Sequence, residues 1–347
     1  MRRLVFITQA ADPLHPALGA TLPMLRALAE RVDEVVVLTD HAAEGALPGN
    51  CVVRTFGAPA RALRGVRFEA ALLTSLRPRP FAVVAHMVPL YALLSAPFVR
   101  PLRIPLLLWY THWHAGRSLR IAERAVTDVV SVDRRSFPFP SAKLAAIGHG
   151  IDLSEFSCVE RSEGRVLRAL VLGRYSPAKG LDVIVRGVAE AARRGLDVRL
   201  TMHGPASNAL ERRHRDEVAR LVGELELADR VELGDPIARA EVPALFAETD
   251  LLVNNMRAGA PDKAVYEACA SCLPALASNP VFDDLLAPEL RFARESPSSL
   301  ADALANVAVL DAGARAAIGR TLREGVAQRH SVDSWADGIL RVVQSRS

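Results

Sequence analysis

Short apolar runs alternate with amphipathic, helix-type patterns along the whole 347-residue chain, and this alternation constrains the fold more than any other feature. Runs of four to eight apolar residues are typical of buried strands, whereas stretches such as Ala17–Glu30 repeat at helical spacing. Strands that alternate with helices form parallel sheets covered on both faces. The predicted strands are Leu4–Thr8, Glu34–Leu38, Phe81–Ala85, Ile104–Tyr110, Val126–Val130, Arg168–Gly173, Val198–His203, Arg230–Leu233, Leu251–Asn254 and Pro274–Ala277.

The strands fall into two series, which predicts two doubly wound α/β domains facing a cleft. A polar stretch within Ile151–Arg165 has the composition of a linker between them. We therefore predict an N-terminal domain over residues 1–155, a C-terminal domain over residues 156–328 and a final helix within residues 329–347. Ligands of open α/β sheets bind beyond the carboxyl ends of the strands, so the residues just after each strand are the candidates for chemistry.

Charge is distributed unevenly between the two halves. Residues 1–150 carry 18 basic and 10 acidic residues, a balance of +8, although the whole chain has a net charge of only +4. No basic tract, interleaved aromatic residues or zinc-finger spacing accompanies this excess, which argues against nucleic acid as a partner. Arg61, Arg64 and Arg67 recur every three residues, either as a solvated helix face or as a basic face for anionic lipid or an anionic acceptor.

The four cysteines are Cys51, Cys158, Cys269 and Cys272, and the last two lie in an apolar helical pattern. We expect small buried thiols here, neither a zinc set nor disulfides.

Neither of the two most apolar segments fits a targeting or membrane-spanning role. The first apolar run is too short for a signal peptide. Pro89–Tyr110 is broken by arginines and prolines, which excludes a membrane-spanning helix. We expect a cytoplasmic protein, with peripheral contact at the inner face of an anionic membrane left open.

The turn from Gly173 to Gly180 carries Arg174 and Lys179, the latter one of only three lysines in the chain. It follows a predicted strand and opens a helix, whose N-terminus adds positive potential. A guanidinium fork beside a compact ammonium suits a diphosphate. The alternative is a pair of solvated cations in a loop.

A second loop of small residues leads into a helix near Asp262, with Lys263 at the helix start and Glu267 one turn later. Such a loop can present backbone N–H groups to an anion. Lys263 and Glu267 are spaced i,i+4 and therefore lie on one helix face, where they can form a surface ion pair. The alternative is that Glu267 accepts hydrogen bonds from vicinal sugar hydroxyls while the helix start binds phosphate.

The order of these motifs resembles the GT-B-fold glycosyltransferases of family 4, a retaining group. The matching residues are Gly148-His149-Gly150-Ile151-Asp152, Gly173-Arg174 with Lys179-Gly180, His203-Gly204-Pro205, and Glu267-Ala268 with Leu273-Pro274 and Ser278. The resemblance covers most of the chain and implies that the C-terminal domain binds a nucleotide-diphosphate sugar. It also implies that the last helix, Val332–Val343, crosses back to the N-terminal domain.

The resemblance assigns roles to individual residues. Arg174 and Lys179 match the pair that binds the donor diphosphate, and Glu267 matches the glutamate that binds the ribose. The first glutamate of the family motif would fall at Gly259, which is a departure from the pattern. The expected donor-binding set is Gly19, Gly173, Arg174, Lys179, His203, Gly204, Asp262, Lys263, Ala264 and Glu267.

Histidines after predicted strands of the N-terminal domain complete the candidates. The family often has a histidine after the strand Ile104–Tyr110, and His112 is our first choice for a catalytic role beside Arg174 and Lys179. His15, His86 and His114 are further candidates for contacts with the acceptor or the sugar.

The predicted function is glycosyl transfer, with retention, from a nucleotide-diphosphate sugar to a hydroxyl acceptor. We expect no cofactor and no metal, since no cluster of aspartates of the kind that holds a divalent cation is evident. A nucleotide-sugar epimerase of the same fold and a catalytically silent sugar-nucleotide-binding protein remain the alternatives.

Overall fold

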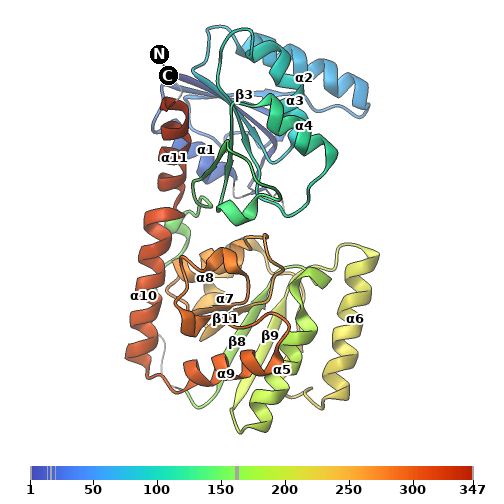
Figure 1. Ribbon diagram of the computed structural model, residues 1–347, viewed down its shortest axis with the longest axis vertical. Helices are drawn as coiled ribbons and strands as arrows, with labels where there is room; N and C mark the ends of the chain where they lie inside the picture. The colour runs from blue at the N-terminus through green and yellow to red at the C-terminus, as the bar shows by residue number, and fades with distance from the viewer. Residues whose placement is uncertain (1, 14, 16–17, 20, 161–163, 346–347) are drawn as a thin grey trace. The chain divides into compact units, whose positions relative to one another are not determined.

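In the computed structural model, the chain forms two compact α/β units, one of residues 1–152 with 329–347 and one of residues 153–328 (Figure 1). We call them unit 1 and unit 2. The structure describes residues 2–13, 15, 18–19, 21–160 and 164–345, so part of the predicted linker and of the helix Ala17–Glu30 lies outside the described residues. The change of unit at Asp152 and Leu153 lies close to the predicted boundary, and the C-terminal segment belongs to unit 1.

Unit 1 is built on a parallel sheet of seven strands in the order β3-β2-β1-β4-β5-β6-β7. Its strands are β1 Arg3–Ala11, β2 Glu34–Ala42, β3 Cys51–Thr55, β4 Ala82–His86, β5 Leu106–Trp109, β6 Asp128–Ser131 and β7 Leu144–Ala146. The two edge strands, β3 and β7, were not predicted. Strand β3 is half-exposed and β7 has only three residues, so neither presents an apolar run in the sequence.

The helices of unit 1 include the C-terminal one. They are α1 Thr21–Ala29, α2 Arg61–Ser75, α3 Pro89–Val99, α4 Arg117–Ala125 and α11 Val332–Gln344, with the 3-10 turn η1 Arg134–Ser136. Helix α11 packs beside α1 (Figure 1), where Arg31 donates to Asp333 at 2.9 Å and to Asp337 at 2.6 Å. Trp335 is fully buried and meets Phe6 edge-on, so the last helix is part of the core of unit 1.

Unit 2 is built on a parallel sheet of five strands in the order β10-β9-β8-β11-β12. The strands are β8 Leu167–Leu172, β9 Val198–His203, β10 Val231–Leu233, β11 Leu251–Asn254 and β12 Ala275–Ala277, and each overlaps a predicted strand. The helices are α5 Leu181–Arg193, α6 Ala209–Glu224, α7 Val242–Ala247, α8 Lys263–Ala270, α9 Pro297–Ala308 and α10 Ala312–Arg329. The 3-10 turns are η2 Leu153–Glu155, η3 Pro177–Lys179, η4 Arg239–Glu241, η5 Pro280–Phe282 and η6 Pro288–Leu290.

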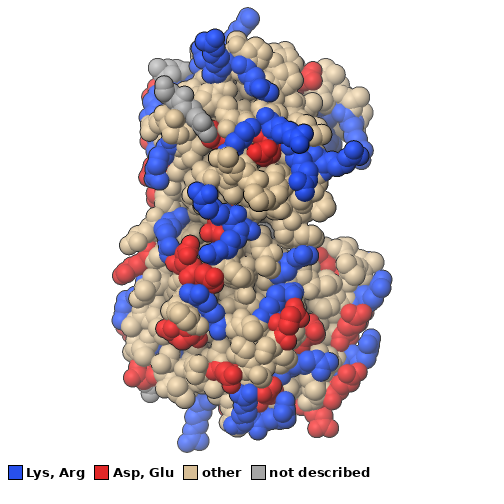
Figure 2. All heavy atoms as spheres, in the orientation of Figure 1, with Lys and Arg blue, Asp and Glu red and all other residues tan. Residues whose placement is uncertain are grey.

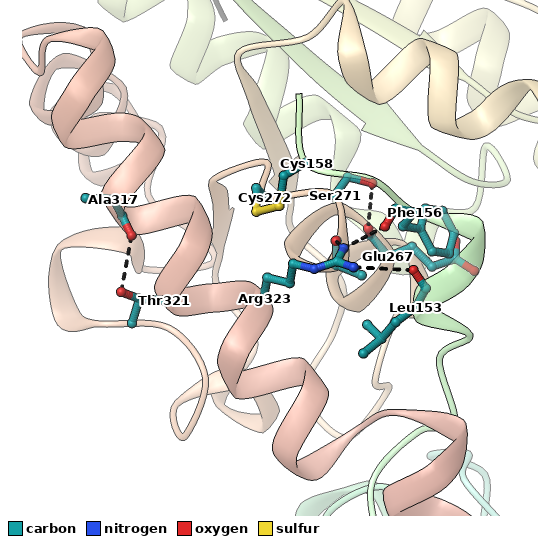
Figure 3. Close-up of a disulfide and its surroundings, with 10 residues drawn as sticks. Leu153, Phe156, Cys158, Glu267, Ser271, Cys272, Ala317, Thr321 and Arg323 are labelled. Atoms are coloured by element: carbon teal, nitrogen blue, oxygen red, sulfur yellow. Dashed lines mark hydrogen bonds between the residues drawn. A yellow bond between two sulfur atoms is a disulfide. The ribbon is translucent and has the colours of Figure 1, made fainter. Parts of the chain in front are cut away.

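A disulfide joins Cys158, which follows η2, to Cys272, which follows α8 (Figure 3). The expectation that all cysteines are free thiols was therefore wrong for this pair, because its members are 114 residues apart in sequence but have Cα atoms only 4.9 Å apart. Arg323 of α10 donates to the carbonyl oxygen of Phe156 at 2.6 Å (Figure 3). It also donates to the carbonyl oxygen of Ala270. The first residues of unit 2 are thus bound to the end of α8.

Within the described part of the chain, no helix combines the length and apolar character needed to cross a bilayer.

Candidate functional site

Three loops of unit 2 follow neighbouring strands at the carboxyl edge of its sheet, and two glycines let them approach closely. A Cβ atom on Gly204, after β9, would lie 2.1 Å from the carbonyl oxygen of Gly173, after β8. Gly173 itself has φ +123°, and the φ range around this value favours glycine. The backbone of Gly173 donates to the carbonyl of His203 at 2.8 Å. These contacts bring the predicted residues Gly173, His203 and Gly204 into one backbone cluster.

Lys179 ends the turn η3, and its side chain folds back against Gly173. Its Nζ atom donates to the carbonyl oxygen of Leu172 at 3.0 Å and pairs with the carboxylate of Asp262. Only 7% of the residue is exposed. A Cβ atom on Gly173 would lie 2.7 Å from Nζ, so the glycine also makes room for the ammonium group. The lysine therefore has one fixed position at the end of β8.

Arg174 has a different environment, with 61% of its side chain exposed. One guanidinium nitrogen lies 3.3 Å from a carboxylate oxygen of Glu211, which is buried in the first turn of α6. Glu211 also accepts from the backbone N–H of Ser207 at 2.8 Å. The buried acid thus orients Arg174, while the rest of the guanidinium group faces solvent and can bind a further anion.

The start of α8 gathers Asp262, Lys263 and Ala264, as predicted for a helix N-terminus at an anion site. Asp262 is the N-cap residue and accepts from the backbone N–H of Ala264 at 3.4 Å. It also accepts from the amide of Asn254 at 2.8 Å. Burial alone would raise the pKa of the Asp262 carboxyl, but the charge of Lys179 and these hydrogen bonds outweigh burial and lower the pKa. Asp262 is therefore ionised at neutral pH.

Glu267 is buried on the next turn of α8 and is held by two cations. Arg239 of η4 donates to it at 2.8 Å, and the Nζ atom of Lys263 lies 3.6 Å away. Arg239 also pairs with Glu155 of η2. Burial lowers the pKa of Lys263, and the carboxylate of Glu267 counters that effect. The predicted pair of Lys263 and Glu267 is thus part of a network of four charged residues that also includes Arg239 and Glu155.

Gly259, where the family pattern has a glutamate, has φ +80°. A glutamate rarely adopts this left-handed conformation, so the glycine is matched to the local backbone. No carboxylate is available at this position.

Four residues of the candidate site were not predicted from the sequence: Arg239, Glu155, Glu211 and Asn254. Arg239 is one of 40 arginines (43 basic residues less three lysines) and lies in no recognised motif. Glu211 had a weak signal, since Asn208 and Glu211 form the N-cap spacing of α6. Their roles depend on neighbours distant in sequence, such as Glu155 for Arg239.

The candidates of unit 1 occupy loops and one core position. His15 accepts from the backbone N–H of Leu18 at 3.0 Å, and Gly19 packs so closely on this loop that a Cβ atom would lie 2.6 Å from the carbonyl oxygen of Pro13. His86, at the end of β4, is 5% exposed and shares a hydrogen bond with Thr8 at 3.1 Å. Burial lowers the pKa of His86 to about 3, which favours a structural role.

His112 and His114 lie in the exposed loop after β5. The backbone N–H of His114 donates to Nδ1 of His112 at 3.0 Å, and the ring of His112 stacks on Trp113. Because Nδ1 accepts this bond, Nε2 of a neutral His112 carries the proton.

Basic side chains predominate over unit 1 on the face drawn in Figure 2, whereas both signs are interspersed over unit 2. Arg64 of α2 lies 3.3 Å from Asp40, and Arg67 donates to the carbonyl oxygen of Gly57 at 2.6 Å. Two of the three arginines of the predicted basic face are therefore bonded within unit 1.

Residues 2–13, 15, 18–19, 21–160 and 164–345 contain no group of three or more His, Cys, Asp or Glu side chains placed to hold a metal ion.

Comparison with known proteins identifies the fold. Residues 167–309 match the family model described as Glycosyl transferases group 1. A glycosyltransferase from Rickettsia africae superposes with a TM-score of 0.78 at 11% identity, over 99% of this chain and 98% of that one. The chain has the GT-B fold. The predicted fold class is thereby confirmed.

Two curated relatives of this GT-B protein are D-inositol 3-phosphate glycosyltransferases. The one from Kineococcus radiotolerans is 30% identical over 125 residues, and the one from Mycobacterium marinum is 26% identical over 211 residues. The matches cover 32% and 58% of this chain, and 28% and 38% of the respective relatives. The matched stretches thus span less than half of the relatives' length. Residues 167–309 contain most of the site of unit 2, including Arg174, Lys179 and Glu267.

Proposed function

We propose that this protein is a glycosyltransferase that moves a sugar from a nucleotide-diphosphate sugar to a hydroxyl acceptor, with retention of configuration. One observation carries the proposal: the region that matches the glycosyl transferases group 1 model brings Arg174, Lys179 and the N-terminus of α8 together at the carboxyl edge of one sheet. This edge is where open α/β sheets bind ligands, and the three groups are those suited to a diphosphate.

The proposed chemistry needs only the substrates and the side chains present. The bond between the anomeric carbon and the diphosphate oxygen breaks, the acceptor oxygen bonds to that carbon, and the acceptor proton leaves with the diphosphate. Lys179, Arg174 and the start of α8 stabilise the negative charge that develops on the leaving group. Glu267 accepts hydrogen bonds from ribose hydroxyls.

An anionic polyol is the first acceptor to test. The two curated relatives are named for D-inositol 3-phosphate, and residues 1–150 of this chain carry a net charge of +8 that would attract a phosphorylated acceptor.

The proposed location is the cytoplasm. A peripheral location, with the α2 face in contact with anionic lipid, is the alternative.

The test is acceptor-dependent release of nucleoside diphosphate. UDP-, GDP- and ADP-sugars are first ranked by thermal shift, since a bound ligand raises the apparent stability by mass action. The best donor is then incubated with and without D-inositol 3-phosphate and a panel of other polyols. We expect release only when donor and acceptor are both present, and its loss in Lys179→Ala.

Two results would contradict the proposal. Donor isomerisation without nucleotide release would indicate an epimerase. Donor binding without turnover on any acceptor would indicate a silent binding protein, an alternative that the glycine at position 259 favours.

A further inference from the structure

Four cations at the carboxyl edge of unit 2 are paired with carboxylates of the same unit. Lys179 pairs with Asp262, Arg174 with Glu211, and both Arg239 and Lys263 with Glu267. Glu155 adds a second acid to Arg239. Four cations therefore face four carboxylates, and the cluster has a formal charge of zero. A diphosphate that binds to these four cations therefore meets carboxylates that are already paired with them.

Lys179 is the member of this cluster with the least freedom. An ammonium group has three donors, and here one contacts the carbonyl oxygen of Leu172 and another the carboxylate of Asp262. The side chain is 8% exposed and lies against Gly173, so it cannot swing out to meet a ligand. A phosphate that uses Lys179 must come to the position where the carboxylate of Asp262 now lies, or beside it.

Asp262 occupies both halves of the anion site at once. One carboxylate oxygen contacts Lys179 and the amide of Asn254, and the other accepts from the N–H of Ala264 in the first turn of α8. These ammonium, amide and backbone donors are the groups that a phosphate oxygen would use. A phosphate next to the ionised carboxylate would place two like charges within a few ångströms, which costs binding energy in a partly buried site.

We propose that Asp262 is an internal competitor of the donor diphosphate, and that donor binding requires the contact between Lys179 and Asp262 to open. Asp262 is 17% exposed and its side chain lies at a helix end, so it can turn away while Lys179 stays in place. The inference rests on the proposed function, because it concerns the same site. It makes Asp262 a residue that sets donor affinity.

The test compares Asp262→Asn with the wild-type chain. Asparagine is nearly isosteric and also caps helices, so the variant removes the charge and keeps the N-cap. The dissociation constants of UDP, GDP, ADP and inorganic pyrophosphate are measured by calorimetry at one ionic strength. We expect the dissociation constant of the best nucleotide to fall by about tenfold in Asp262→Asn. Asp262→Gly, which removes the carboxylate altogether, should give a similar gain if the asparagine variant folds poorly.

Two further variants separate competition from a structural effect. Asp302→Asn is the matched control, because Asp302 pairs with Arg194 at the far end of α5 and its loss removes the same charge. We expect a change below twofold. Lys179→Ala alone should weaken nucleotide binding, since it removes the ammonium group that the phosphate would take over and leaves the carboxylate of Asp262 without its paired cation.

The outcomes distinguish the inference from the proposed function. Nucleotide binding by the wild type that weakens or stays unchanged in Asp262→Asn would overturn the inference and leave the proposed function intact. Pyrophosphate that binds more tightly to Asp262→Asn while no nucleotide binds any variant would support the competition and overturn the nucleotide-sugar function. Absence of binding by every probe to every variant would overturn both.

Discussion

At the scale of single residues, Lys179 shows why lysine and arginine are not equivalent at this site. Its ammonium group is enclosed by the carbonyl oxygen of Leu172, the carboxylate of Asp262 and the α-carbon of Gly173. A guanidinium group is larger, planar and cannot be placed as a point charge. In a chain that uses arginine almost throughout, this enclosed position favours a compact cation.

We therefore expect Lys179→Arg to lose at least about tenfold in kcat/KM, a barrier increase of about 1.4 kcal/mol. Lys179→Ala should lose more, because the leaving group then has no ammonium partner. The matched control is Lys143→Arg in unit 1, where Nζ donates to the carbonyl oxygens of Glu123, at 2.7 Å, and Val126, at 2.9 Å. Activity in Lys179→Arg equal to that of the wild type would contradict this account of the lysine.

The glycine cluster gives a second prediction. Gly204→Ala would place a methyl group 2.1 Å from the carbonyl oxygen of Gly173, a backbone atom that cannot move without displacing the loop of Arg174. We expect a loss of about 1–3 kcal/mol in the free energy of unfolding together with weaker nucleotide binding. Chemical denaturation and calorimetry measure the two effects.

The control for that variant is Gly223→Ala in α6, where a Cβ atom would meet nothing within 4 Å. Alanine in a helix is favoured over glycine by up to about 1 kcal/mol, so this variant should be stabilised or unchanged. Equal destabilisation by both substitutions would show that the close contact between Gly173 and Gly204 does not contribute specifically to the free energy of unfolding.

At the scale of elements, the start of unit 2 is bound to the end of α8 by the disulfide between Cys158 and Cys272 and by Arg323 (Figure 3). Helix α8 begins, at its other end, with the residues of the candidate anion site, and η2 supplies Glu155 to the network of Arg239. The covalent link thus joins two segments that both contribute to the candidate site.

We expect Cys158→Ser to lower the free energy of unfolding of unit 2 by about 2–4 kcal/mol under oxidising conditions, because the bond closes a long loop in the unfolded chain. In dithiothreitol the variant and the wild type should have nearly the same stability. Cys51→Ser, at a free and half-buried thiol of unit 1, is the control and should not respond to the reductant. A wild-type stability that does not change with reductant would contradict the disulfide.

At the scale of the whole molecule, two units with separate cores should respond differently to acid. His86 and His330 both belong to unit 1, and burial lowers the pKa of each to about 3. Between about pH 6.5 and pH 3 the unfolded chain binds these two protons and the native chain does not. Stability therefore falls as the pH drops through this window, by about 2 kcal/mol for each histidine at pH 5.

Tryptophan fluorescence can follow this transition, since Trp109, Trp113 and Trp335 all lie in unit 1. We expect the denaturation midpoint reported by tryptophan to fall between pH 7 and pH 5, and His86→Asn to reduce that fall. A midpoint that does not change over this range would contradict the burial of the neutral histidines.

The alternation of apolar runs and helical patterns determined the α/β class, ten of the strands and the two-unit organisation, because burial on both faces forces parallel strands to be apolar. It did not reveal β3 or β7, whose edge positions relax that requirement. Local signals of this kind depend only on residues near in sequence, so they locate Lys179, Arg174 and the start of α8 individually.

Tertiary structure alone decided what those residues contact. The sequence predicted that Arg174 and Lys179 suit a diphosphate but gave no carboxylate partner for either. The fold pairs Lys179 with Asp262, Arg174 with Glu211 and Arg239 with Glu267. Asp262 and Lys179 are 83 residues apart, as Cys158 and Cys272 are 114 apart. Charge pairing and disulfide formation depend on distances in space, and those distances exist only after the strands of the sheet have assembled.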